Sequence, residues 1–106
     1  SYVALEEAIA QAGLAENLVS SERTGIVMGA GGASTENIVE SIDILRSRGV
    51  RKVGPYRVTR TMNSAINANL STPFKIKGVN YSVTSACATS AHCIGVAAQQ
   101  IRCNSE

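Results

Sequence analysis

Apolar residues recur at helical spacing in the first segment of the chain. Leu5, Ile9 and Ala12 repeat every three or four positions, and Gly13 follows where a left-handed cap would end a helix. This pattern predicts a helix over residues 2–12. A short apolar run over residues 24–28 then predicts a buried strand, because strands that are covered on both faces lack polar alternation.

A second helical pattern follows a glycine-rich loop at residues 29–32. Ser34 is a good N-cap residue, Glu36 lies in the first turn, and Gly49 closes the helix. One face of this helix is apolar and carries Ile38, Ile42 and Leu45. Gly54 and Pro55 then indicate a turn, after which we expect a further helix over residues 59–70.

The last third of the chain changes from a period of two to a helical period. Apolar and polar residues alternate over 79–84, which predicts a strand, and residues 87–102 read as a helix. An apolar stripe along this helix consists of Ala91, Ile94, Ala98 and Ile101. The many small residues around it indicate close packing on several sides, in a body larger than this chain. Helices alternate with strands, which is typical of an α/β fold.

Composition and charge exclude several classes of protein. The chain has 106 residues, of which 44% are apolar, and that suits one globular domain. No apolar run approaches the roughly 18 residues of a membrane span, and no secretory leader is visible. The net charge of +2 does not by itself indicate nucleic-acid binding. Three cysteines are a poor disulfide framework, so we expect reduced thiols in a cytoplasmic protein.

Cys87 occupies the corner where the predicted strand turns into the last helix. The amide groups at a helix start are unpaired and carry partial positive charge, so they stabilise a thiolate and lower the pKa of the thiol. Such a thiolate can attack a thioester carbonyl, and the same amides can stabilise the oxyanion. The alternative is a small buried thiol that only fills space.

The segment Ser85-Ala-Cys-Ala-Thr-Ser-Ala-His-Cys-Ile-Gly resembles the nucleophile motif of the β-ketoacyl-acyl-carrier-protein synthases. Upstream, residues 53–56 and 72–82 resemble the type I enzyme of bacterial fatty-acid elongation, in the same order and spacing. The resemblance implies a thiolase-like fold, with an α/β core of layered helices and a mixed sheet, and a homodimer. It also implies acyl transfer to Cys87, followed by decarboxylative condensation with malonyl-acyl carrier protein, without a cofactor.

The resemblance assigns further roles outside the cysteine motif. Gly31 matches a position that lines the acyl pocket, and Met62 lies in a segment that reaches the partner subunit's pocket in the family. Arg48 and Arg51 match positions that dock the acidic acyl carrier protein. These two lie in a basic stretch at 46–60, for which an ordinary solvated surface is the other interpretation. Nucleotide binding by the glycine loop is disfavoured, and no C-x₂-C pair predicts a metal.

Two departures from the family pattern predict a piece of a longer enzyme. Family members are several hundred residues long and carry paired catalytic histidines and a lysine downstream of the nucleophile. His92 is the only histidine here and matches neither of them, so we expect no condensation by this chain alone. The start at Ser1 and the unrelated tail at 102–106 look like truncations. We therefore assign residues 1–106 to part of the N-terminal half, with the nucleophile elbow at 82–90. A non-catalytic acyl-binding or interaction module, and an assembly fragment with an inert thiol, are the alternatives.

Overall fold

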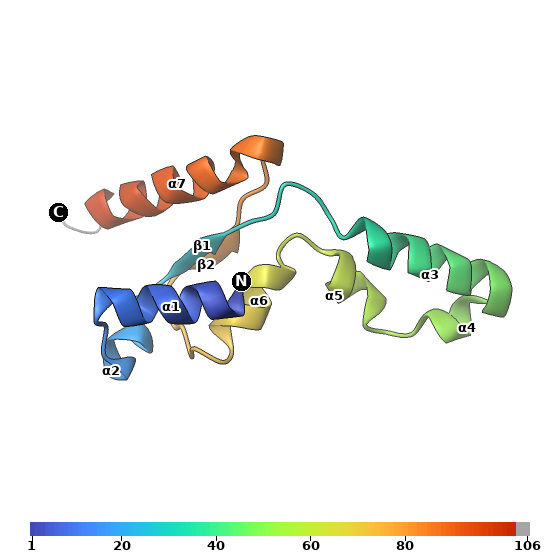
Figure 1. The fold of residues 1–106 in the computed structure, drawn as a ribbon, viewed down its shortest axis with the longest axis horizontal. Coiled ribbons are helices and arrows are strands. Elements are labelled where there is room, and N and C mark those ends of the chain that lie inside the picture. The colour runs from blue at the N-terminus through green and yellow to red at the C-terminus, as the bar shows by residue number, and fades with distance from the viewer. Residues whose placement is uncertain (104–106) are drawn as a thin grey trace.

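The computed structural model describes residues 1–103 and confirms an α/β arrangement (Figure 1). The helices are α1 (Tyr2–Ala12), α2 (Glu16–Val19), α3 (Thr35–Arg48), α4 (Val50–Val53), α5 (Arg57–Thr61), α6 (Ala65–Ser71) and α7 (Thr89–Cys103). The strands are β1 (Ile26–Met28) and β2 (Asn80–Ser82), and a 3₁₀ turn, η1 (Ala86–Ala88), precedes α7. Within this described range no helix is both long and apolar enough to cross a membrane.

The two strands pair in parallel although some fifty residues separate them. Ile26 lies opposite Asn80 and Met28 lies opposite Ser82. The ladder continues past β2, where the Val83 N–H donates to the Met28 carbonyl over 3.2 Å. Parallel strands need a long crossover connection, and the helices from α3 to α6 supply it. The carboxyl ends of β1 and β2 therefore meet at one edge of the sheet.

Most of the sequence-based elements are present with the expected ends. Gly13 adopts a left-handed conformation, with φ of 64°, at the end of α1. Ser34 caps α3 by accepting a hydrogen bond from the Asn37 N–H, and Gly49 follows the last residue of that helix. The strands are shorter than predicted, since regular pairing covers three residues in each. The tail at 104–106 lies outside the described residues.

The prediction of one helix over residues 59–70 is wrong. Helix α5 ends at Thr61 and α6 begins at Ala65, with Met62 in an extended conformation between them. The Asn63 side chain donates a hydrogen bond of 3.2 Å to the Thr84 hydroxyl beyond the end of β2. This contact joins residues twenty-one positions apart, so the helical spacing of the sequence does not predict it. It links the segment between the two helices to the residues after β2.

The buried side chains gather around the strand pair. Helices α6 and α7 lie on opposite sides of it in Figure 1, and both contact β1. The buried apolar residues among those described are Val19, Ile26, Leu70 and Cys93. Helix α7 faces the sheet with Thr89 and Cys93, whereas its predicted apolar stripe is not buried, with Ile94 72% exposed. The close packing expected on several sides of α7 is therefore not seen in the described part of the chain.

Helix α6 meets β2 through polar side chains. Asn67 is buried, and its amide nitrogen donates to the Tyr81 carbonyl over 2.9 Å and to the Asn80 side-chain oxygen over 3.2 Å. Asn63, just before α6, makes a more exposed contact to Thr84, just after β2. Hydrogen bonds are directional, so the part-buried Asn67 amide helps to fix how α6 sits along β2.

Candidate active site

Cys87 is an exposed thiol in η1, between the end of β2 and the start of α7. The sequence placed it at the first turn of the α-helix, but α7 itself begins at Thr89. Ala86 has a φ of 43°, in the left-handed region that residues with a Cβ rarely adopt. This strained residue reverses the chain sharply and carries the next side chain out to the surface. The predicted elbow is therefore present as a strained 3₁₀ turn.

Hydrogen bonds close the turn from within. The Ala88 N–H donates to the Ser85 carbonyl over 2.9 Å, and the Thr89 N–H donates to the Ala86 carbonyl. These two amides are therefore used inside the turn and are not directed at a ligand. The expectation that several amides of the helix start stabilise an oxyanion needs correction, because the amides of Ala88 and Thr89, the two residues after Cys87, both bond within the turn.

The glycine-rich loop after β1 lies directly beside this turn. A Cβ on Gly29 would come within 1.8 Å of the Val83 carbonyl oxygen, and one on Gly31 within 2.9 Å of the Ala86 carbonyl oxygen. Neither position can carry a side chain without moving the neighbouring backbone. The structure thus brings Gly31 against the residue that precedes Cys87, at the sheet edge where parallel strands of α/β proteins commonly hold ligands.

Of the other candidate residues, Met62 lies near the Cys87 turn, whereas Arg48 and Arg51 lie far from it. Met62 is exposed in the link between α5 and α6, and its neighbour Asn63 is bonded to Thr84, three residues before the cysteine. Arg48 and Arg51 lie at the corner between α3 and α4, at the far end of a molecule 55 Å long (Figure 1). The chain brings Met62 near the turn but keeps both arginines away from it.

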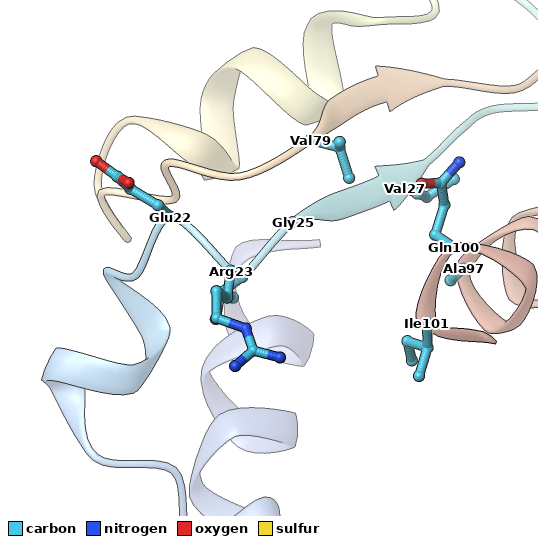
Figure 2. A pocket seen from close by; sticks show the side chains of 9 residues that line it. Glu22, Arg23, Gly25, Val27, Val79, Ala97, Gln100 and Ile101 are labelled. Carbon is cyan, nitrogen blue, oxygen red and sulfur yellow. The ribbon is translucent and has the colours of Figure 1, made fainter. Parts of the chain in front are cut away.

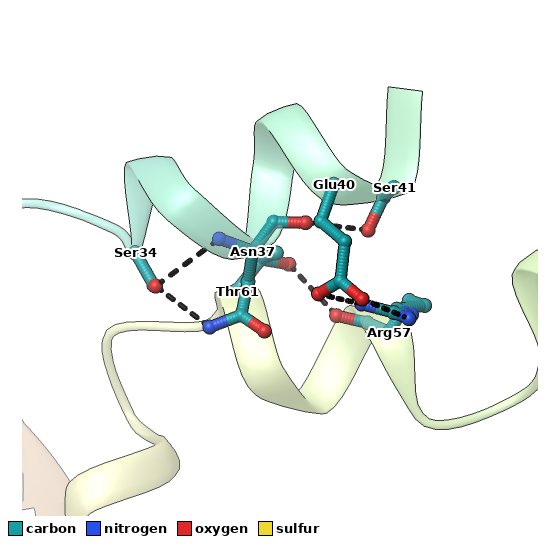
Figure 3. Close-up of polar contacts among 6 residues, drawn as sticks. All are labelled: Ser34, Asn37, Glu40, Ser41, Arg57 and Thr61. Atoms are coloured by element: carbon teal, nitrogen blue, oxygen red, sulfur yellow. Dashed lines mark hydrogen bonds and ion pairs between the residues drawn. The ribbon is translucent and has the colours of Figure 1, made fainter. Parts of the chain in front are cut away.

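One arginine of the basic stretch is engaged within the chain (Figure 3). Arg57 on α5 forms a two-pronged ion pair with Glu40 on α3, and one of the two nitrogen–oxygen distances is 2.9 Å. The hydrogen bonds from Arg57 hold the pKa of Glu40 below its ordinary value, and the same bonds raise the pKa of Arg57. The basic stretch is thus not a uniform free surface, since Arg57 joins two helices.

The remaining thiols and the histidine are placed differently from Cys87. Cys93 is buried on the sheet side of α7, and Cys103 and His92 are exposed on that helix. In the described residues the three cysteines are free, and no group of three or more His, Cys, Asp or Glu side chains converges as a metal site would require. Cys87 is therefore the thiol that combines exposure with a strained strand–helix turn.

A hollow of about 740 Å³ lies at the opposite end of the strands (Figure 2). It is lined by Glu22, Arg23, Thr24, Gly25, Val27, Val79, Ala97, Gln100 and Ile101. These residues come from the amino ends of the strands and the carboxyl end of α7. None of the residues predicted for the site lines this hollow, so the hollow and the cysteine turn are separate features.

A model of the family described as "Beta-ketoacyl synthase, N-terminal domain" matches residues 1–106. The chain belongs to this family. The match also confirms the prediction of a thiolase-like α/β fold, since that fold was inferred from the same family. The parallel strand pair and its helical crossover, which flank the cysteine turn, agree with this fold.

Several curated relatives are similar over nearly the whole chain. It is 54% identical over 103 residues to 3-oxoacyl-[acyl-carrier-protein] synthase 1 of Haemophilus influenzae, and 51% identical over 104 residues to the protein of that name in Escherichia coli K12. It is 38% identical over 103 residues to nodulation protein E of a Rhizobium species. The matches cover 96–97% of this chain but only 25–26% of each relative, so the chain spans about a quarter of their length.

Sequence reasoning did not single out Thr89, which is the best-connected side chain of the turn. Its hydroxyl accepts a hydrogen bond from the Ser85 N–H over 2.9 Å and donates one to the Ala86 carbonyl over 2.8 Å. A threonine at the start of a helix is a recognised signal for such local bonds, so the pattern was available. Asn67 was also missed, because a polar residue in a helix carries no sign of which strand it will meet.

Proposed function

We propose that this chain is the cysteine-bearing part of a β-ketoacyl-acyl-carrier-protein synthase that elongates fatty acids. The Cys87 thiolate attacks the carbonyl carbon of an acyl thioester, the bond from that carbon to the carrier thiol breaks, and the acyl group stays on Cys87. The observation that carries the proposal is an exposed thiol on a strained turn at the carboxyl edge of the sheet, in a chain of this family.

The second half of the reaction forms the carbon–carbon bond. Malonyl thioester loses carbon dioxide, its α-carbon attacks the acyl carbonyl, and Cys87 leaves as the thiolate. The enolate that forms on the way needs preorganised donors. His92 is exposed on α7 and is the sole histidine of the chain. We infer that these donors come from other parts of the intact enzyme, so this chain accepts an acyl group but does not condense it.

The remaining assignments belong to the same proposal. We take residues 1–106 as part of the N-terminal half of the enzyme, with the elbow at 82–90. Gly31 and Met62 contribute to the acyl pocket, and Arg48 and Arg51 dock the carrier protein. The intact enzyme is a cytoplasmic homodimer. The position of Gly31 against Ala86 and the exposure of both arginines support these roles.

The test begins with the three thiols of the folded chain. Limited alkylation with iodoacetamide, followed by peptide mass mapping, should label Cys87 before Cys103 and well before buried Cys93. An acyl-acyl carrier protein should then transfer its acyl group to Cys87, seen as an added mass on that peptide. A Cys87→Ser variant is the control and should acquire no acyl mass. Labelling of Cys87 last among the three would overturn the proposal.

Condensation is tested separately, with malonyl-acyl carrier protein added to the acylated chain. We expect no release of carbon dioxide and no β-ketoacyl product. Turnover that depends on Cys87 would contradict the inference that the enolate-stabilising donors come from other parts of the intact enzyme. Another group of this chain would then be stabilising the enolate.

A further inference from the structure

Thr89 ties the turn around Cys87 together, although it plays no part in the acyl transfer described above. It is 3% exposed, so its side chain is enclosed on nearly every side. Its hydroxyl reaches backwards across the turn, accepting from the Ser85 N–H over 2.9 Å and donating to the Ala86 carbonyl over 2.8 Å. One hydroxyl thus bonds to the N–H before and the carbonyl after the peptide bond that joins Ser85 to Ala86.

The peptide held in this way is the strained one. Ala86 has a φ of 43°, which its Cβ disfavours, and such a conformation persists only where surrounding contacts hold it. Ser85 has a φ of −150° and a ψ of 50°, outside the regular helical and strand regions. Without the two bonds to Thr89, the Ser85–Ala86 segment has less to oppose its relaxation toward negative φ.

The methyl group of Thr89 is held as firmly as its hydroxyl. A Cβ built on Gly29 would lie 2.8 Å from the Thr89 Cγ2 atom, so the methyl packs directly on the backbone after β1. Threonine has few χ1 rotamers, and this packing restricts them further. The hydroxyl therefore cannot swing away from Ser85 and Ala86 while α7 stays docked on β1.

We propose that Thr89 is a positioning residue for Cys87, holding Ala86 in its left-handed conformation and thereby fixing where the thiol sits. The inference rests on the proposed nucleophilic role of Cys87 and extends it to a residue that does not touch the substrate. The conformation of Ala86 sets the direction in which the next side chain leaves the turn, and so how readily the Cys87 sulfur meets a reagent. A residue that only capped α7 would change stability, and Ala86→Gly would not offset its loss.

The experiment measures the rate of Cys87 alkylation by iodoacetamide at pH 7, in the folded 106-residue chain and in its urea-unfolded form. Thr89→Val keeps the shape but removes the hydroxyl. We expect it to slow Cys87 by about tenfold, the scale of one hydrogen bond. Thr89→Ser keeps the hydroxyl and should react within about twofold of the original. Buried Cys93 reports in the same digest whether α7 remains docked.

A rescue variant separates positioning from loss of structure. Glycine adopts positive φ without the steric cost, so Ala86→Gly should lessen the need for Thr89. The double variant Ala86→Gly with Thr89→Val should regain most of the Cys87 rate and of any lost Cys93 protection. Such recovery supports the positioning role even if Thr89→Val alone unfolds. No recovery overturns it, as does a Thr89→Ser variant as slow as Thr89→Val.

The two proposals fail in different ways. If Cys87 of the original chain reacts no faster than in urea, the nucleophile assignment fails and the positioning role falls with it. If Cys87 is fast in the original chain and equally fast in Thr89→Val, the nucleophile assignment stands and only the role of Thr89 is overturned.

Discussion

The region around the two strands and the excursion formed by α3, α4 and α5 are held in different ways. Around the strands, side chains from α2, α6, α7 and β1 are buried, and Leu70 is 1% exposed. In α3, α4 and α5 no residue is buried, and Leu45 on the apolar face of α3 is 48% exposed. The first region gains from burial of apolar surface, whereas the second gains little from it.

The excursion relies instead on local signals and on one ion pair. Ser34 caps α3, glycines separate its helices, and Arg57 joins α5 to Glu40 on α3. Contacts of this kind are each worth little compared with a filled core. The cysteine turn lies in the first region and the candidate carrier-binding arginines in the second. This chain therefore holds its cysteine turn on a packed support and two of its exposed arginines on an open one.

Truncating one leucine in each region should give the largest difference in the free energy of unfolding. Leu70→Ala should lower the free energy of unfolding by roughly 2–5 kcal/mol, because it removes a fully enclosed side chain and leaves a cavity. Leu45→Ala, the matched change on α3, should stay within about 0.5 kcal/mol. Urea unfolding followed by circular dichroism measures both. Equal losses would mean that the excursion has a core of its own.

A smaller effect is expected where α6 meets β2. Asn67→Ala removes the donor to the Tyr81 carbonyl and should cost about 0.5–1.5 kcal/mol, the net contribution of a typical hydrogen bond within a protein. Asn69→Ala on the exposed side of the same helix is the control and should change stability little. The same urea titration compares them. If both substitutions have the same small effect, the polar contact does not hold this interface.

Charge reversal on the excursion tests its proposed partner. Replacing both Arg48 and Arg51 with Glu should weaken binding of acidic acyl carrier protein by about tenfold at low salt, and the difference should shrink as salt is added. The control reverses two exposed cations near the strands, Arg23→Glu with Lys77→Glu, and carries the same net charge. Isothermal titration calorimetry measures the affinities. Equal weakening in both double variants would reduce the effect to overall charge.

The smallest expected effect concerns the ion pair within the excursion. The pKa of Glu40 is lowered by its hydrogen bonds to Arg57, so the pair contributes fully above the ordinary carboxyl value of 4.5 and is lost as the pH falls through the lowered one. Amide exchange in α5 should therefore quicken below pH 4.5, after correction for the intrinsic pH effect. Glu40→Gln should show no such step. A step that survives in Glu40→Gln would assign the titration to another group.

Local features of the fold could be predicted from the sequence with few errors. Gly13, Ser34 and Gly49 act through their own backbone or through neighbours a few residues away, so their effect is written in adjacent positions. The family resemblance likewise rested on contiguous residues around Cys87, and it was confirmed. The break at Met62 was missed because it is accompanied by a contact of Asn63 with Thr84, twenty-one residues away, which no helical period encodes.

The same division separates the parts of the candidate site. The sequence by itself determined that a cysteine follows a strand and precedes a helix, because alternation and helical spacing are local properties of a chain. Only the tertiary structure decided that the turn is 3₁₀ with Ala86 at positive φ, and that Gly31 lies against it. It also decided that Thr89 closes the turn. Those outcomes depend on how the parallel ladder brings residues 29–31 beside 83–89, and long-range pairing has no signature in either segment alone.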